Sequence, residues 1–144
     1  MDVIRRNTDY ALRAMVRLAQ GFGGDAVSAR TLADDSSVSY QLMCKLLQKL
    51  QGAGFLSSSM GPAGGYRLVK NPAEINLAEV VEIIQGPVII IGCVAKDTRC
   101  PCKGTCSISP NLAKIQKQLE EYLQSVTLKQ LVDESKIKGS NNGQ

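Results

Sequence analysis

The chain has 144 residues, of which 44% are hydrophobic, and it carries a net charge of +4 with five cysteines and no histidine. This length and apolar content suffice for one compact domain, or for a small domain with a helical appendage, without stabilising crosslinks. No run approaches the roughly 18 apolar residues of a membrane span, and the first residues lack a signal-peptide pattern. We therefore expect a cytoplasmic protein with reduced thiols.

The missing histidine and the charge distribution narrow the class of protein further. Without histidine the chain lacks the commonest general base and the Cys–His pair of thiol enzymes, which argues against catalysis. Residues 1–72 carry nine Lys and Arg against five Asp and Glu, whereas residues 73–144 carry eight of each. The basic excess in the N-terminal half fits a nucleic-acid surface there, and a solvated surface of mixed charge is the alternative.

Three helices are predicted in the first third of the chain. Apolar residues recur at helical spacing between Thr8 and Phe22, with Thr8 as the N-cap and GFGG as the end of the helix. Ser28 can cap a short second helix, ARTLADD. A third helix is expected from about Ser39 to Ala53, with Gly54 at its C-cap.

The third helix has a leucine-rich side and a polar side. The apolar side consists of Val38, Leu42, Met43, Leu46, Leu47 and Leu50, and the polar side of Tyr40, Gln41, Cys44, Lys45, Gln48 and Gln51. Two short helices joined by a tight turn, the second with a hydrogen-bonding outer face, form a helix-turn-helix whose recognition helix enters the major groove. An ordinary surface helix is the alternative. The predicted DNA contacts here are Ser28, Ser39, Tyr40, Gln41, Cys44, Lys45 and Gln48.

A β-hairpin is predicted directly after the recognition helix. SSMGPAGG followed by YRLVK indicates two short strands joined by a loop rich in glycine and proline, which is the pattern of a wing. Gly61 and Gly64 would let the backbone approach DNA closely, and Arg67 and Lys70 can contact phosphates.

A further helix is expected to close the winged domain, residues 1–86. Asn76 and Glu79 have the spacing of a capping box, and Ile75 and Val80 that of a hydrophobic staple. The helix should run from Leu77 to about Gln85.

Residues 87–109 form a cysteine-rich loop, in which GCVAKDTRCPCKGTCS holds four of the five cysteines. In a reducing compartment such a cluster indicates metal or redox chemistry. Thiolates are the usual ligands of iron–sulfur clusters, and the neighbouring Lys96, Arg99 and Lys103 favour deprotonated thiols. A structural zinc site and an unligated thiol sensor are the alternatives.

Residues 110–135 are predicted to contain a long dimerisation helix and a short closing helix, TLKQLVDE, followed by a flexible tail over residues 136–144. Ser109 and Pro110 resemble an N-cap with proline at the first helical position. A narrow apolar seam with spacings of three and four indicates packing on a partner helix, commonly a second copy, and packing on its own domain is the alternative. The seam consists of Leu112, Ile115, Leu119, Tyr122 and Val126.

The helix-turn-helix, the wing GPAGGYRL, the helix NLAEVVEIIQG, the cysteine loop and the closing VTLKQLV resemble, in this order, the Rrf-type winged-helix regulators of bacteria, the family of IscR and NsrR. The resemblance covers nearly the whole chain. It implies a mainly α-helical fold with a small β-hairpin wing. It also implies a homodimeric repressor on a palindromic operator, with an iron–sulfur cluster near the dimerisation helix as its sensor.

The resemblance also implies a ligand set. In the IscR type a histidine follows the three cysteines, but Ser109 lies near that position here. In the NsrR type an aspartate in the first turn of helix one, from the other subunit, completes the coordination, and NTDYALR resembles that segment with Asp9 in the matching place. A carboxylate stabilised by the helix dipole is the alternative for Asp9.

The three cysteine ligands in this family are evenly spaced, and the resemblance therefore favours Cys93, Cys100 and Cys106, which are separated by six and five residues. Cys102 is then a spare thiol or an alternative fourth ligand. A [4Fe–4S] cluster is favoured over [2Fe–2S]. The signal, whether nitric oxide, redox state or iron–sulfur status, stays open. Competing hypotheses are a cluster-free thiol or zinc-site regulator and an iron–sulfur carrier.

Overall fold

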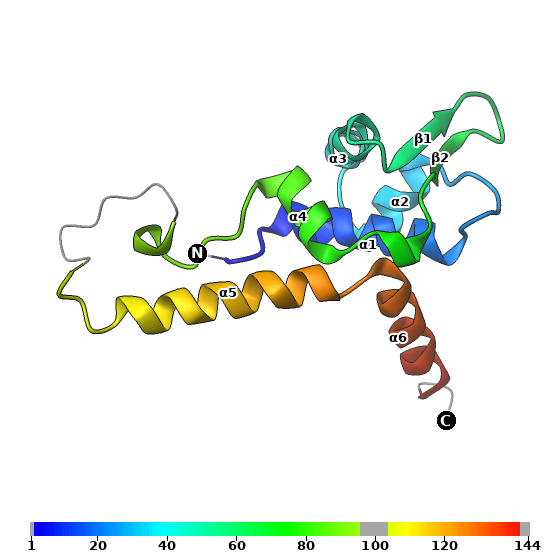
Figure 1. The fold of residues 1–144 in the computed structure, drawn as a ribbon. Coiled ribbons are helices and arrows are strands. Elements are labelled where there is room, and N and C mark those ends of the chain that lie inside the picture. Colours follow the sequence, from blue (N-terminus) through cyan, green and yellow to red (C-terminus); the bar gives the residue numbers. More distant parts are fainter. Residues whose placement is uncertain (1, 96–103, 142–144) are drawn as a thin grey trace.

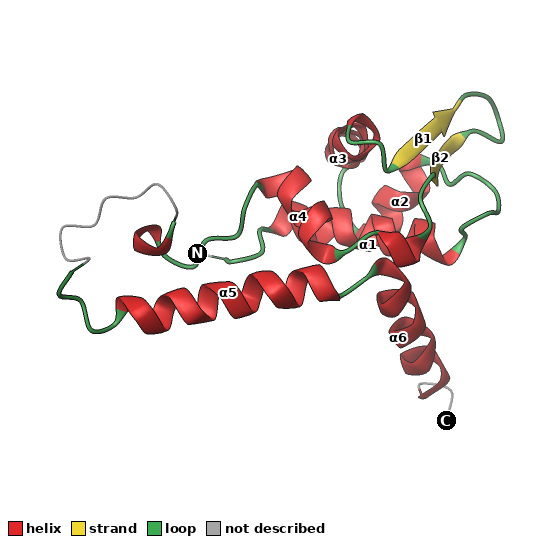
Figure 2. Ribbon diagram, viewed as in Figure 1, coloured by secondary structure: helices red, strands yellow, loops and turns green. Residues whose placement is uncertain are grey.

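Over its described residues the protein is mainly helical with one two-stranded hairpin, as predicted (Figures 1 and 2). The computed structural model describes residues 2–95 and 104–141. In chain order the elements are α1 (Arg6–Gln20), α2 (Ala29–Ser36), α3 (Tyr40–Gly52), β1 (Leu56–Ser59), β2 (Gly65–Leu68), η1 (Pro72–Glu74), α4 (Leu77–Gln85), η2 (Gly92–Val94), α5 (Ser109–Ser125) and α6 (Leu128–Asn141).

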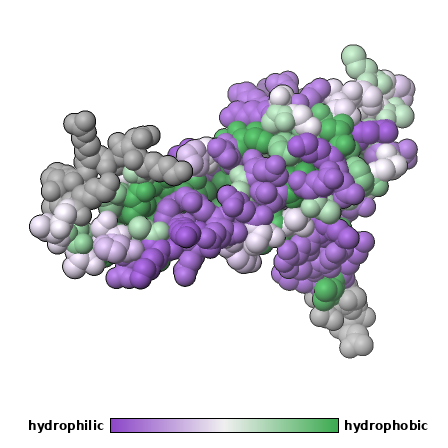
Figure 3. Space-filling view, in the orientation of Figure 1, coloured by the Kyte–Doolittle hydropathy of each residue, from purple (hydrophilic) through white to green (hydrophobic). Residues whose placement is uncertain are grey.

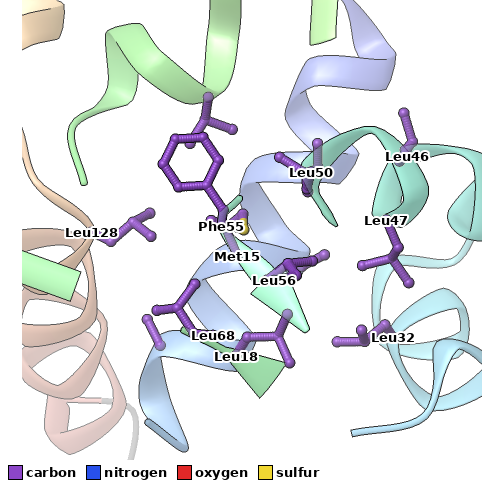
Figure 4. Packing of buried hydrophobic residues seen from close by; sticks show 14 of the residues in the cluster. Met15, Leu18, Leu32, Leu46, Leu47, Leu50, Phe55, Leu56, Leu68 and Leu128 are labelled. Carbon is purple, nitrogen blue, oxygen red and sulfur yellow. The ribbon is translucent and has the colours of Figure 1, made fainter. Parts of the chain in front are cut away.

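The core lies where α1, α2, α3, α4 and the hairpin meet, and the first turn of α6 packs into it. Figure 4 shows apolar side chains from these elements converging on Met15 of α1. Met15, Leu50 and Leu128 have no exposed surface. Figure 1 shows α5 running below this domain and extending past it toward the cysteine segment. The described part of the chain contains no helix with the length and hydropathy needed to cross a membrane.

The predicted N-caps of α2 and α4 are confirmed. The Ser28 hydroxyl accepts a hydrogen bond from the N–H of Thr31. Ser39, predicted as about the first residue of the third helix, is its N-cap and accepts the N–H of Leu42, and the C-cap of α3 is Ala53, one residue before the predicted Gly54. Asn76 and Glu79 form the reciprocal capping box, with distances of 3.0 and 2.9 Å. Ile75 and Val80 are both completely buried. These caps satisfy N–H groups at the starts of α2, α3 and α4 that have no partner within their own helix.

Two predicted N-caps are wrong. Helix α1 begins at Arg6, so Thr8 lies inside its first turn. The Thr8 hydroxyl is buried and donates to Gln85 Oε1 instead of capping the helix. Helix α5 has Ile108 as its N-cap and makes no side-chain cap bond. Ser109 is its first helical residue, and Pro110 follows within the first turn, where its missing N–H costs nothing.

The predicted flexible tail is wrong for residues 136–141, since α6 continues to Asn141. No proline interrupts this stretch. Lys138 lies in the last turn, where the helix dipole favours a cation. The hydroxyl of Ser135 donates to the carbonyl of Val132, a buried residue of the same helix.

Candidate DNA interface and cysteine segment

Helix α3 presents the polar face predicted for a recognition helix. Met43, Leu46, Leu47 and Leu50 are buried against the domain. The opposite side is open to solvent except for Cys44, which is half-buried; its exposed residues are Tyr40, Gln41, Lys45, Gln48 and Gln51. The face therefore offers hydrogen-bond donors and acceptors and two cationic or aromatic groups without any carboxylate.

A cluster of side chains at the start of α3 joins three elements, and two of its members were not predicted. The guanidinium carbon of Arg30, on α2, lies 4.9 Å from the centre of the Tyr40 ring, a cation–π contact. A hydrogen bond with the Cys44 thiol raises the pKa of Tyr40. Burial, followed by the charge of Cys44, raises the pKa of Tyr66 on β2. Arg30 and Tyr66 are far from Tyr40 in sequence, so only the tertiary fold brings this cluster together.

The wing is a rigidly mounted hairpin. Strands β1 and β2 pair antiparallel from Leu56 opposite Leu68 to Ser59 opposite Gly65. The base is held by a two-way backbone bridge, in which Val27 N–H donates to Tyr66 at 2.9 Å and Tyr66 N–H donates to Val27 at 2.8 Å. The bridge fixes the wing relative to the segment that enters α2.

Two wing glycines are explained by the hairpin itself. A Cβ on Gly64 would collide with the carbonyl of Ser59, and Gly65 has φ +147° directly against the carbonyl of Val27. Gly61, with φ +98°, has open space around it, so its backbone alone is free for close approach by a partner. The tip beside it carries Met60, whose side chain is almost completely exposed.

The predicted phosphate contacts are available. Arg67, on β2, and Lys70, just after β2, are both exposed. The Lys70 ammonium lies 5.0 Å from the centre of the buried Phe55 ring, which restricts where its charge can reach. Arg67 pairs through its backbone with Ser57 on β1.

The described cysteines of the loop lie at its two ends. Cys93 is in η2 and Cys106 precedes α5, and both are half-buried free thiols. Cys100 and Cys102, like Lys96, Arg99 and Lys103, lie outside the described residues. Within residues 2–95 and 104–141, no three Cys, Asp or Glu side chains gather as a metal site.

Asp9 lies in the first turn of α1, as predicted, and is half-exposed. Its Oδ2 is 3.1 Å from Nε of Arg13, one turn along the helix. This i,i+4 contact on an exposed surface contributes little to stability, on the order of 0.3 to 0.5 kcal/mol. The carboxylate therefore loses little if it exchanges Arg13 for another partner.

The apolar seam of α5 is largely unpaired within one chain. Ile115 is 51% exposed and Tyr122 64% exposed, while Leu112 and Leu119 are half-buried. Val126 was wrongly assigned to the seam. Val126 is only 5% exposed and is the residue that follows the end of α5. The Val126 carbonyl accepts the N–H of Leu77 at 2.9 Å, which ties Val126 to the chain's own winged domain.

Comparison with known proteins identifies the family. The Rrf2 model, described as an iron-dependent transcriptional regulator, matches residues 4–134. The HTH-type transcriptional regulator NsrR of Shouchella clausii is 30% identical over 126 residues, covering 87% of this chain and 85% of the relative.

Two solved structures share both fold and sequence with the chain. CymR, the global cysteine regulator of B. subtilis, is similar at 27% identity with a TM-score of 0.76, covering 92% of this chain and 98% of CymR. IscR of T. potens is similar at 26% identity with a TM-score of 0.70, covering 92% of this chain and 87% of IscR. With these matches spanning the winged domain, the cysteine segment and α5, the chain belongs to the Rrf2 family of winged-helix transcriptional regulators.

Proposed function

We propose that the protein is a homodimeric repressor that binds a palindromic operator and senses its signal through an iron–sulfur cluster at the cysteine segment. The observation that carries the proposal is the combination of a carboxylate-free polar face on α3 with two free, half-buried thiols, Cys93 and Cys106, at the ends of the cysteine segment. The first feature suits DNA and the second suits a thiolate-bound centre.

On DNA, α3 would lie in the major groove. Tyr40, Gln41, Cys44, Lys45 and Gln48 would face base edges, where amide and cationic side chains discriminate between bases. Ser28 and Ser39 cap α2 and α3, so their neighbouring N–H groups would meet phosphates at two helix starts. Arg67, Lys70 and the open backbone at Gly61 would position the wing, whereas Gly64 acts by shaping it.

The donor chemistry fits an iron–sulfur cluster. Cysteine thiolates are its usual ligands, and the chain offers no imidazole as an alternative. Cys93, Cys100 and Cys106 would hold it, with Asp9 of the partner subunit or Cys102 as the fourth ligand. When bound, a [4Fe–4S] or [2Fe–2S] cluster would supply a group that reacts with nitric oxide or oxidants. Its occupancy would also fall when iron is scarce.

Dimerisation would use the seam of α5. Ile115 and Tyr122 present apolar surface to solvent, with Leu112 and Leu119 beside them. A second copy packing on this seam would bury it and set the distance between the two copies of α3. That distance must match half-sites about one helical turn apart.

A cluster-free thiol regulator is the second candidate. Its support is the similarity to CymR, a cysteine regulator by name, together with free thiols at Cys44, Cys93 and Cys106. Under this hypothesis the cysteines would respond to oxidants directly, and a zinc site would be the metal-bound variant.

The deciding experiment is anaerobic purification followed by an absorption spectrum and iron and sulfide analysis. It is combined with binding to a palindromic promoter fragment at moderate salt, before and after the cluster is removed. We expect a coloured protein containing iron and sulfide whose operator affinity changes on cluster removal. A colourless protein that binds the operator would favour the thiol or zinc regulator, and a coloured protein without preference over bulk DNA would favour a carrier.

A further inference from the structure

The segment between α4 and η2, residues 87–91, leads directly to Cys93 and is held to the protein in an unusual way. It belongs to no helix or strand, and Val88 is buried while Ile89 and Ile91 are exposed. In the described part of the chain, the Ile91 carbonyl accepts the N–H of Val94 in the adjoining η2, and the segment's other bonds to an element are made by the side chain of Gln116, on α5. Figure 3 shows hydrophobic surface along this segment.

Both the oxygen and the nitrogen of the Gln116 side-chain amide form hydrogen bonds. Its Oε1 accepts the N–H of Ile90 at 2.9 Å, and its Nε2 donates to the carbonyl of Val88 at 2.6 Å and to Glu120 Oε1 at 2.8 Å. The side chain is 7% exposed. It thus pairs with the segment as a neighbouring strand would, taking one N–H and one C=O two residues apart.

Little else fixes the segment. A cavity of about 480 Å³ lies beside it, lined by Val88, Ile89 and Val94 on one side and by Gln116, Glu120 and Leu123 on the other. Close packing therefore does not hold residues 87–91 against α5. The amide contact and the buried Val88 side chain are the two anchors.

We propose that Gln116 is a positioning residue that fixes Cys93 relative to α5, and thereby relative to Cys106 at the start of that helix. Its regulatory meaning rests on the proposed function, because two ligands must keep a defined separation to share one metal centre. The effect on Cys93 itself requires no metal. The other end of α5 is tied to the winged domain, where Leu77 N–H donates to Val126 and Leu128 N–H donates to Ile75. Opening the Gln116 contact would free residues 87–91 and the adjoining Cys93 while leaving that end of α5 attached.

Full-length, reduced, metal-free protein provides the first test. Hydrogen exchange is measured at the Ile90 amide, and maleimide labelling of Cys93 and Cys106 is followed by peptide mass spectrometry. In Gln116→Leu the exchange rate at Ile90 should rise about tenfold or more, since the N–H and the Val88 carbonyl lose their partner. Labelling of Cys93 should accelerate several-fold, whereas that of Cys106 should not.

Gln118→Leu is the matched control, because Gln118 is an exposed glutamine on the same helix. It should leave exchange at Ile90 and labelling of Cys93 unchanged. Gln116→Glu keeps the acceptor but loses the donor, and places a carboxylate against the Val88 carbonyl and Glu120. The exchange rate of the Ile90 amide in Gln116→Glu should lie between those of the wild type and Gln116→Leu. This variant replaces Gln116→Leu in the test if Gln116→Leu fails to fold.

The proposal is overturned if Gln116→Leu leaves Ile90 as protected as Gln118→Leu does. It is equally overturned if Cys93 and Cys106 accelerate together, since that pattern reports general loosening. Anaerobic reconstitution then separates this inference from the proposed function: we expect Gln116→Leu to lose iron several-fold faster than Gln118→Leu. Wild-type protein that takes up no iron would contradict the cluster but not the positioning of Cys93.

Discussion

Gln85, the last residue of α4, holds the first turn of α1 through Thr8. Gln85 Oε1 accepts the Thr8 hydroxyl at 2.7 Å and the backbone N–H of Arg5 at 2.9 Å, and Nε2 donates to the carbonyl of Val3 at 2.9 Å. Thr8 is completely buried. One amide therefore ties the N-cap residue Arg5 and the Thr8 side chain to the end of α4 and holds the turn that carries Asp9.

Replacing Gln85 by leucine should destabilise the protein by about 1 to 3 kcal/mol, because the buried Thr8 hydroxyl and the Arg5 N–H lose their partner. Urea unfolding of the metal-free protein measures this free energy. Thr8→Val alone should also destabilise, but in the Gln85→Leu background it should cost less, since the hydroxyl is already unpaired. Equal costs of Thr8→Val in both backgrounds would show that the two side chains do not cooperate.

Whether a helix cap could be predicted from the sequence depends on how far apart in the chain the interacting residues lie. Ser28 and the Asn76–Glu79 box were predictable because a cap joins residues two or three apart, and the burial of one side of α3 follows from its period. Thr8 satisfies the same local rule, but its partner lies 77 residues away, and no local pattern announces such a bond.

The same limit applies to the candidate site. Val126 continues the three–four spacing of the seam, yet a backbone bond to Leu77 ends α5 before it. Arg30 and Gln116 look like ordinary surface residues of helices in the sequence. Their roles depend on Tyr40 and on residues 88–90, which only the tertiary fold brings near.

The proposed DNA interface predicts two kinds of mutational effect. Gln41→Ala should cost about 1 to 3 kcal/mol of operator binding and relax the preference at particular base pairs. Arg67→Ala should weaken operator and random DNA alike and reduce the salt dependence by roughly one unit of slope. Binding titrations on both DNAs at several salt concentrations distinguish them. Equal losses on operator and random DNA for Gln41→Ala would remove it from the recognition face.

The seam of α5 predicts how the dimer responds to charge. Ile115→Glu should weaken dimerisation by ten- to hundredfold, because burying an isoleucine contributes about 1.5 to 3 kcal/mol and a carboxylate cannot replace it. Sedimentation over a range of concentrations measures the effect. Lys114→Glu, at an exposed position off the seam, is the control and should remain dimeric. An Ile115→Glu protein with unchanged self-association would mean that the seam is not the interface.

The raised pKa values of Tyr40 and Tyr66 predict how folding stability and tyrosine ionisation change at alkaline pH. A tyrosine whose folded pKa lies above its unfolded value of about 10 holds its proton more tightly when folded. Its stabilising contribution is therefore present below that pH and lost as pH rises through the folded pKa. In a titration of phenolate absorbance, Cys44→Ala should shift tyrosine ionisation to lower pH, because Cys44 raises both pKa values. Cys93→Ala should not, and superimposable curves for wild type and Cys44→Ala would contradict the contact.

The assignment of Asp9 can be tested through subunit exchange. Within one chain Asp9 contacts Arg13, and the proposed function gives its carboxylate to the cluster site of the partner subunit. Cys93→Ser should abolish iron binding, since an alcohol poorly replaces a soft thiolate. Asp9→Ala should leave a cluster that is lost faster, with its fourth position open to small ligands.

Mixed dimers of Asp9→Ala and Cys93→Ser chains then decide which chain supplies the carboxylate. If Asp9 acts across the dimer, the Cys93→Ser chain supplies an intact Asp9 to the intact cysteines of its partner, and one site per mixed dimer should release iron at the wild-type rate. If Asp9 acts within its own chain, no site is complete and all iron should be lost at the rate of the Asp9→Ala homodimer. Arg13→Ala, which removes the partner of Asp9 in its own chain, should retain iron as the wild type does. Wild-type retention in the Asp9→Ala homodimer, with iron lost from Cys102→Ser, would instead assign the fourth position to Cys102.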